Sequence, residues 1–337
     1  MSKKYRIAFV FIIEYGDLEQ KGLLLSESLR RFFPSEIDCP IFAVRPRKGK
    51  EIKQETKEKL MKFHIQYIYE PVNIRWHNLP FANQAYGSAI IEEKIKDEAE
   101  VLVYLDADIV CLKYPDKLFL EEDIKVAITP EDMIQKSNAI KYGDQLSKNW
   151  DFAYNLNHVD RSKLWSIHTK VDKVEIYPSF NSGMIATRPE IGLFRRWREM
   201  FDISVSNGYF AMFPPFSKDK AFFWTDQVFL SSAVVSMFER SEVLILDDSY
   251  NFPPILAKEY SKEHGKIKFD EITFFHYHHY FYGTEWLNYF YVNTRSVQWL
   301  FNKLPIHKDR KTAKYRTWID LFKQYILHYY WKIIKIF

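Results

Sequence analysis

Short apolar runs alternate with longer amphipathic segments through the first third of this chain. Residues 7–13, 41–44, 66–69 and 101–105 are short, largely apolar stretches of the kind that form buried strands. Between them, residues 18–33, 51–64 and 81–95 carry apolar positions at helical spacing. Strands that alternate with helices are typical of βαβ units around a mainly parallel sheet, so the pattern predicts an α/β fold.

Two aspartates, Asp106 and Asp108, follow the last of these predicted strands. Residues i and i+2 point the same way as a chain leaves a strand, so both carboxylates can be aimed at one point. Parallel sheets bind ligands just beyond the carboxyl ends of their strands. Two converging carboxylates repel each other unless a cation lies between them, and their hard oxygens suit Mg²⁺ or Mn²⁺. The alternative is an aspartate-rich turn with no ligand.

Glycine-rich phosphate-binding motifs are absent from the sequence. No Gly-x-Gly-x-x-Gly follows the first predicted strand, and no Walker lysine loop occurs. A phosphate-containing ligand would therefore need another source of positive charge, which favours the metal interpretation of the aspartate pair.

The segment 178–188 contains a compact run of small polar residues, Asn181, Ser182 and Gly183, which we interpret as a turn that opens a strand. A glycine there would let the backbone approach a ligand closely.

Further on, Thr225 is a candidate N-cap for a helix over 228–238. Asp226 would then lie near the positive end of the helix dipole, which by itself explains an acidic residue there. The aromatic segment 207–224 is either a platform for sugar rings or a hydrophobic flap.

Three histidines, His276, His278 and His279, end an apolar run late in the chain. Imidazoles can complete a metal site that carboxylates begin. On a continuous strand, His276 and His278 would share a face and His279 would lie opposite. A solitary histidine is usually structural, but this density favours a ligand-binding role.

The order of these motifs resembles a GT-A glycosyltransferase. Tyr-Leu-Asp-x-Asp, then Phe-Asn-Ser-Gly-Met, then Asp-Gln and finally His-Tyr are most similar to glycosyltransferase family 8, over roughly residues 5 to 285. The resemblance implies a Rossmann-like mixed, mainly parallel sheet flanked by helices, with Mn²⁺ (or Mg²⁺) holding the diphosphate of a UDP-sugar. It implies three groups of site residues: the metal ligands Asp106, Asp108 and His276; the donor-binding residues Ile13, Glu14, Asn83, Ser88, Asp106, Asn181 and Ser182; and the catalytic pair Asp226 and Gln227.

Two departures from the family pattern concern positive charge. The family's His-x-x-Gly-x-x-Lys-Pro-Trp segment is reduced here to His276 followed by Gly283 and Trp286, without a matching lysine. The basic residue of the helix before the aspartate pair is also absent, and Asn83 and Ser88 are offered instead.

The resemblance implies transfer of a hexose from a nucleotide sugar to a glycan or lipid-linked saccharide, with retention of configuration. Three alternatives stay open. The string from Asp106 to Val110 also fits the nucleophile loop of haloacid-dehalogenase-type phosphatases, with Asp247 and Asp248 as that family's last motif. The other two are a catalytically silent sugar- or nucleotide-binding protein and an inverting GT-A enzyme.

Composition and charge bear on the organisation of the chain. We expect a catalytic domain over 1–302, with a nucleotide-binding half (1–112) and an acceptor and donor-sugar half (113–302), and a tail over 303–337. The tail carries a charge of +7 in a chain of net charge +4, so the remainder is about −3. Within it, residues 315–337 place aromatic and aliphatic positions at helical spacing among lysines, a pattern typical of an amphipathic helix in a membrane interface.

These features give expectations about surroundings and partners. The alternative for the tail is a helix packed on the catalytic domain. No run of about 20 apolar residues predicts a spanning helix. No nucleic-acid-binding module accompanies the basic charge, so no nucleic acid partner is expected. Only two cysteines, Cys39 and Cys111, are present, which indicates a reducing compartment. We therefore expect a cytoplasmic protein, peripheral on the cytoplasmic membrane face.

Overall fold

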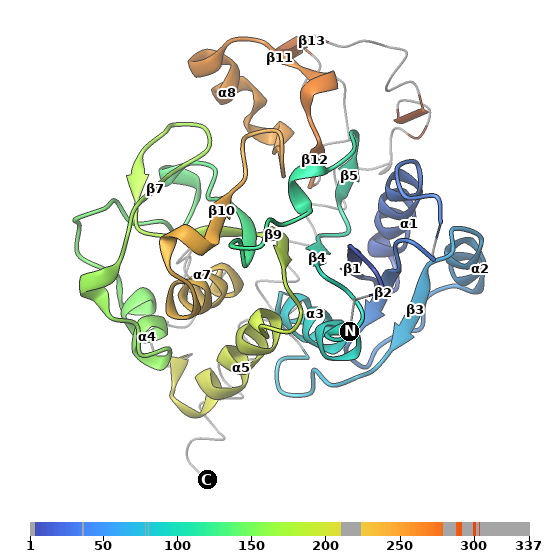
Figure 1. Ribbon diagram of the computed structural model, residues 1–337, viewed down its shortest axis with the longest axis horizontal. Coiled ribbons are helices and arrows are strands. Elements are labelled where there is room, and N and C mark those ends of the chain that lie inside the picture. The colour runs from blue at the N-terminus through green and yellow to red at the C-terminus, as the bar shows by residue number, and fades with distance from the viewer. Residues whose placement is uncertain are drawn as a thin grey trace.

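A seven-stranded sheet forms the centre of the computed structural model, which describes residues 4–35, 37–77, 79, 81–209, 224–278, 288–291, 299–300 and 303. The strands lie in the order β10-β6-β9-β4-β1-β2-β3 (Figure 1). They are β1 (Ala8–Ile12), β2 (Ile41–Arg45), β3 (Gln66–Tyr69), β4 (Leu102–Leu105), β6 (Val126–Pro130), β9 (Phe180–Thr187) and β10 (Val243–Ile245). Every strand runs in one direction except β9, which pairs antiparallel with β4 and β6.

Helices cover both faces of this sheet because its strands are apolar on both sides. They are α1 (Asp17–Arg30), α2 (Gln54–Lys62), α3 (Ala82–Ile95), α4 (Lys148–Leu156), α5 (Leu193–Ser206), α7 (Thr225–Met237) and α8 (Ala257–His264). Along β1, Ala8, Val10 and Ile12 pack in the cluster that contains buried residues of α3, α5 and α7. The alternate residues of the same strand pack in a second cluster with α1 and α2. Because successive side chains point to opposite faces of a strand, β1 contributes to the core on each side of the sheet.

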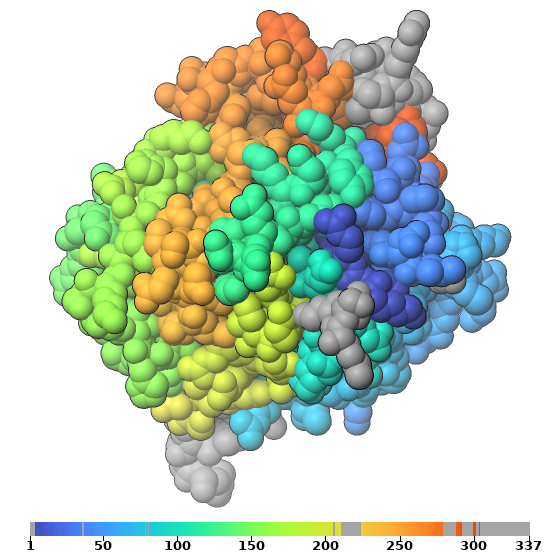
Figure 2. Space-filling view, in the orientation of Figure 1, coloured from blue at the N-terminus to red at the C-terminus, as the bar shows by residue number. Residues whose placement is uncertain are grey.

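A two-stranded antiparallel ribbon lies beyond the carboxyl edge of β4. It consists of β5 (Ile109–Cys111) and β12 (Phe274–His276), with His276 opposite Ile109 in register. A third apolar cluster packs around Val110 and Phe275 of the ribbon, and α8 lies close by (Figure 1). In the space-filling view the orange surface of this late segment meets the green surface that follows β4 (Figure 2). The short pairs β7 (Ile167–His168) with β8 (Glu175–Ile176), and β11 (Ile267–Lys268) with β13 (Phe290–Tyr291), lie outside the main sheet.

The predicted fold class is confirmed: the chain forms a mixed, mainly parallel sheet flanked by helices, the GT-A type of architecture. Each strand and helix expected in the first 105 residues is present, with ends that differ by at most three residues. The helix expected from residue 51, for example, begins at Gln54 because Lys53 is still extended, at φ −62° and ψ 148°.

Two local predictions were wrong. Thr225 is the first helical residue of α7, and Trp224 takes the cap position without a side-chain hydrogen bond. Asn181, Ser182 and Gly183 are not a turn but lie inside β9, at the edge of the sheet where the parallel strands have their carboxyl ends. The tail 303–337 falls, apart from Lys303, outside the described residues, as does 210–223 of the aromatic segment. Among the described helices, none has both the length and the apolar character needed to cross a bilayer.

Candidate active site at the carboxyl edge of the sheet

Two neighbouring strands, β4 and β9, bring predicted motifs together at one edge of the sheet. Asp106 follows β4, and because β9 runs the opposite way, its first residues lie at the same edge. The backbone amide of Asp106 donates to the carbonyl of Gly183 at 2.8 Å. Antiparallel insertion of β9 between two parallel strands therefore places the Asn-Ser-Gly run directly beside the aspartate pair.

Asp106 is held from inside the fold. One carboxylate oxygen, Oδ1, accepts the Tyr104 hydroxyl at 2.6 Å and the Gln84 amide at 2.9 Å. The other, Oδ2, lies 3.8 Å from Nε2 of His276. Burial raises the pKa of the Asp106 carboxyl to about 6; His276 opposes this shift and the charge of Asp108 adds to it. The carboxylate is thus fixed by one oxygen and presents the other to the site.

Asp108 has a different partner on each oxygen. Oδ1 lies 3.1 Å from Nε2 of His276, and Oδ2 accepts the Lys21 ammonium at 2.8 Å. Burial acts to raise the pKa of the Asp108 carboxyl, but Lys21 and His276 outweigh it and hold that pKa well below its usual range. Asp108 is therefore the member of the aspartate pair that its neighbours favour in the charged form.

A chain of hydrogen bonds fixes the tautomer of His276. The Gly183 amide donates to Oδ1 of Asn181 at 2.9 Å, so that atom is an acceptor. The Asn251 group 2.9 Å from the same atom must then be its NH₂, which leaves the Asn251 carbonyl oxygen facing Nδ1 of His276 at 2.8 Å. Nδ1 therefore carries a proton.

The consequence appears on the other side of the His276 ring. In the neutral imidazole, Nε2 presents a lone pair to a carboxylate oxygen of Asp108 only 3.1 Å away. Two acceptors at that distance repel, so the pair needs a proton or a cation between or beside them. This contact between two acceptors fits a metal ion at the site. A histidine that binds a metal through one ring nitrogen ordinarily donates the N–H of the other to a neighbouring oxygen.

A third donor completes a candidate metal site. Donor atoms of Asp108, His276 and His278 lie within 4.8 Å of one another, the spacing that ligands around a single divalent cation would have. The expectation that a continuous strand aligns the two histidines was wrong, because β12 ends at His276 and His278 has a left-handed φ of 50°. Their rings still lie 3.7 Å apart by centroid. His279 is outside the described residues.

Beside the candidate metal ligands lies a buried polar region built from β9 and the start of α7. Ser182 Oγ donates to Oδ2 of Asp226 at 2.5 Å. Among the described residues, Asp226 Oδ1 and Gln227 Oε1 are buried without a hydrogen-bond partner. Burial raises the pKa of Asp226 to about 7, and the Ser182 hydrogen bond offsets part of that shift. Unpaired buried acceptors of this kind are suited to a ligand rich in hydroxyl groups.

Of the remaining donor-binding candidates, Glu14 and Asn83 are in contact, whereas Ile13 and Ser88 are turned toward the fold itself. Glu14 accepts from Asn83 at 3.0 Å and pairs with Arg47 at 2.5 Å, so both predicted residues lie together at the ends of β1 and α3. The Ile13 side chain is fully buried in the core and can offer a ligand only its backbone. The Ser88 hydroxyl donates back to carbonyls of its own helix, at 2.7 Å to that of Gln84, rather than to the other candidate residues.

Several site residues are not identifiable by sequence reasoning. Gln84 adjoins the predicted Asn83, and Asn251 has φ 56°, a conformation that asparagine tolerates better than most residues. Glu131 directly follows β6 and is 4% exposed, and burial together with Asp132 and Asp226 raises its pKa well above the usual range. Lys21 lies in a helix with many polar positions, where nothing local distinguishes it from a surface lysine.

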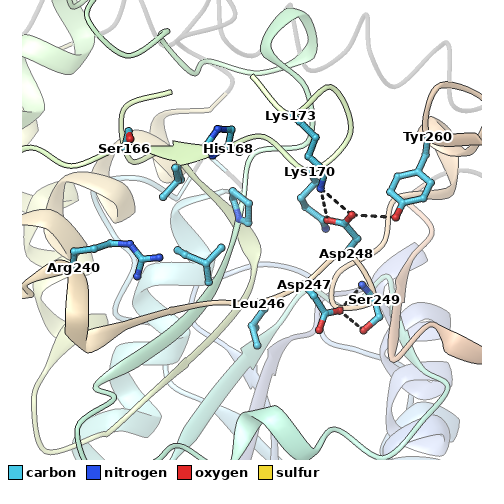
Figure 3. A pocket seen from close by; sticks show the side chains of 13 residues that line it. Ser166, His168, Lys170, Lys173, Arg240, Leu246, Asp247, Asp248, Ser249 and Tyr260 are labelled. Carbon is cyan, nitrogen blue, oxygen red and sulfur yellow. Dashed lines mark hydrogen bonds and ion pairs between the residues drawn. The ribbon is translucent and has the colours of Figure 1, made fainter. Parts of the chain in front are cut away.

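A second concave region lies beside this site, at the ends of β6 and β10. It is a pocket of about 600 Å³ in which Tyr260 donates to Asp248 and Ser249 donates to Asp247 (Figure 3). Lys173 contacts Asp248 at 2.9 Å, and Asp247 pairs with Lys117. The phosphatase hypothesis would require these aspartates to act together with Asp106, which is not among the residues that line the pocket.

Comparisons with known proteins agree with the geometry. A model of the Rhodobacterales glycosyltransferase domain matches residues 9–238. No curated protein matches the chain in sequence.

Similar solved structures include three glycosyltransferases. The bifunctional glycosyltransferase WbbM has 12% identity and a TM-score of 0.47, covering 81% of this chain and 45% of its own. The galactosyltransferase LgtC, solved with donor and acceptor sugar analogues, has 11% identity and a TM-score of 0.45, covering 91% and 99%. GlyE of Streptococcus pneumoniae has 15% identity and a TM-score of 0.45, covering 92% and 66%. Because the family model spans more than half of the residues and includes the aspartate pair, Asn-Ser-Gly and Asp-Gln, this chain belongs to the Rhodobacterales glycosyltransferase domain family and is a glycosyltransferase.

Proposed function

We propose that this glycosyltransferase moves a hexose from a nucleotide sugar, with UDP as the nucleotide, to a glycan or lipid-linked saccharide in a reaction that requires Mn²⁺ or Mg²⁺. The observation that carries the proposal is the close contact between Nε2 of His276 and the Asp108 carboxylate, next to Asp106 and the unpaired acceptors of Asp226 and Gln227. The order of motifs supports kinship with glycosyltransferase family 8, and with it retention of configuration.

The residues divide the work of such a reaction. A bound divalent cation would supply charge that stabilises the departing diphosphate, held by Asp108, His276 and the free oxygen of Asp106. Asp226 and Gln227 lie where they can bind hydroxyl groups of the donor sugar. As the bond to phosphate breaks, the sugar gains oxocarbenium character, and the neutral amide of Gln227 can face it without forming a covalent bond.

One experiment tests the proposal as a whole. The protein is incubated with a panel of UDP-, GDP- and CMP-linked sugars in Mn²⁺, and release of the free nucleotide is measured with and without EDTA. We expect release from a UDP-hexose that depends on the metal and is lost in Asp108→Asn, at a cost of several kcal/mol in the barrier. Turnover that survives both EDTA and this substitution would contradict the metal-dependent mechanism.

Two product analyses separate the alternatives. A phosphatase would release inorganic phosphate from simple phosphomonoesters and lose that activity in Asp106→Asn. A silent binding protein would bind the nucleotide without releasing it from the sugar. The anomeric configuration of the product, read by NMR, separates retention from inversion.

We also propose that the basic, aromatic segment 315–337 holds the enzyme at the cytoplasmic face of a membrane, which suits a lipid-linked acceptor. Truncation after Pro305 should abolish sedimentation with anionic vesicles while activity on a soluble acceptor survives. Equal vesicle binding by the full-length and truncated proteins would contradict this.

A further inference from the structure

A buried lysine reaches the candidate metal site from the side of α1. The side chain of Lys21 is only 7% exposed, and its ammonium lies 2.8 Å from Oδ2 of Asp108. The ring of Tyr277 lies 6.0 Å from the same ammonium. α1 lies beside β5, so the lysine comes from the first helix of the chain and its partner from the loop after the fourth strand of the main sheet (Figure 1). Removing a lysine from water is unfavourable without such a partner, which makes the position specific.

Asp108 separates its two oxygens between two kinds of positive group. Oδ1 is oriented toward His276, which together with His278 would share it with a divalent cation. Oδ2 belongs to Lys21. A cation at the histidines would therefore be accompanied by a second, fixed positive charge bound to the same carboxylate.

The reaction under "Proposed function" creates a need for that second charge. The diphosphate gains negative charge as its bond to the sugar breaks, and preorganised cations are the largest source of stabilisation for such a leaving group. The sequence lacks the lysine of the family's motif after His276, and at the start of α3 it has Asn83 and Gln84 in place of the family's basic residue. Arg47, another cation at this edge, is already paired with Glu14.

We propose that Lys21 is the diphosphate-binding cation of this enzyme, donating one N–H to Asp108 and another to an oxygen of the leaving diphosphate. The inference rests on the proposed function. An ammonium has three donors, so binding the phosphate does not require it to release the aspartate. Lys21 thereby supplies from the first helix the charge that the missing motif lysine after His276 would have supplied.

The test compares two nucleotides that differ by one phosphate. Affinities for UDP and UMP are measured by calorimetry in Mn²⁺ for the parent, Lys21→Met and Lys21→Arg, with GDP and GMP used if the parent prefers guanine. Lys59→Met is the control, because Lys59 forms an exposed pair with Glu55 on α2. We expect Lys21→Met to weaken UDP binding by about 10- to 100-fold, to change UMP binding by less than about threefold, and Lys21→Arg to retain most of the UDP affinity.

A second measurement separates this role from a purely structural one. Without nucleotide, Mn²⁺ should bind Lys21→Met at least as tightly as the parent, because the substitution removes a positive charge beside the metal ligand. If Lys21 only neutralised buried Asp108, the ratio of UDP to UMP affinity would equal that of the parent, and this would overturn the proposal. If Lys21→Met does not fold, Lys21→Gln takes its place, because glutamine keeps a hydrogen bond to Asp108 without the charge. The ratio of UDP to UMP affinity must then fall below that of the parent.

The affinity measurements test Lys21 whether or not the protein transfers a sugar. A parent that binds UDP more tightly than UMP but releases no nucleotide from any donor contradicts the proposed function while leaving the Lys21 comparison intact. A parent that binds neither UDP nor GDP overturns the Lys21 proposal.

Discussion

Gly183 lies against the His276 ring, and substitution with alanine tests the geometry of the site directly. An added Cβ would meet Cε1 of His276 at 2.7 Å, Nδ1 of His276 at 3.0 Å and Oδ1 of Asn181 at 3.0 Å. Gly183 lies within β9 and has no left-handed backbone, so alanine fits the main chain there. The effect of the substitution therefore comes from the contacts with the His276 ring and the Asn181 side chain.

The size of the effect follows from these distances. The ring must retreat by about 0.7 Å to reach an ordinary carbon–carbon separation. Nδ1 of His276 lies 2.8 Å from the Asn251 oxygen, and a shift of that size in the wrong direction breaks this hydrogen bond. Overpacking costs about 1–3 kcal/mol and the lost hydrogen bond about 1 kcal/mol, so we expect unfolding to become easier by about 2–4 kcal/mol.

Two assays read the result. Urea unfolding without metal measures the loss of stability, and titration with Mn²⁺ followed by electron paramagnetic resonance measures metal affinity. We expect affinity to fall about 10- to 100-fold, as for loss of a group that orients a metal ligand. Gly49→Ala is the control, because a methyl group there meets nothing within 4 Å. A Gly183→Ala protein with parental stability and parental Mn²⁺ affinity would refute the placement of His276 against β9.

Three further predictions concern other buried groups. Tyr104→Phe removes a hydroxyl that donates to Asp106 at 2.6 Å, so turnover should fall about 10-fold or more in steady-state assays while the circular dichroism spectrum is unchanged. Burial raises the pKa of Asp226 to about 7, so the stability linked to its neutral form is complete below about pH 4 and lost as the pH rises to 7. Relative to Asp226→Asn, the parent should therefore lose up to about 4 kcal/mol across that window in urea unfolding; a constant difference would contradict the shift. Glu92 accepts two backbone amides at the start of α5, at 3.0 and 2.8 Å, so Glu92→Ala should cost about 1–3 kcal/mol in thermal unfolding, whereas Glu93→Ala, on the surface, should cost less than about 1 kcal/mol.

The strands and helices of the first 105 residues are predictable because their apolar spacing is set by local geometry. A strand buried on both faces, such as β4, reads as a continuous apolar run in any context. The antiparallel β9 is less predictable, since its direction depends on which neighbours it joins. This is why Asn181 to Gly183 read as a turn, although the structure extends them as a strand.

The residues of the candidate site likewise include some that the sequence predicts and some that it does not. Asp106, Asp108 and His276 stand out because ionisable side chains next to apolar strands are unusual. Lys21 and Asn251 do not, because each acquires its role from a partner more than 20 residues away, at 2.8 Å in both cases. Sequence periodicity carries no information about such pairings. The predicted roles of the individual site residues stay predictions that the substitutions above would test.

The pairing of β5 with β12 has a consequence for the order in which parts of the site are synthesised. Asp108 and His276 are separated by 168 positions in the chain, so at about 5–20 residues per second the first leaves the ribosome about 10 to 30 seconds before the second can join it. During that interval the nascent chain carries Asp106 and Asp108 without His276. The half-built site exposes clustered carboxylates and the unpaired edge of β5 to chaperones and to stray cations. The proposed metal site can therefore form only after both strands of the ribbon have been synthesised.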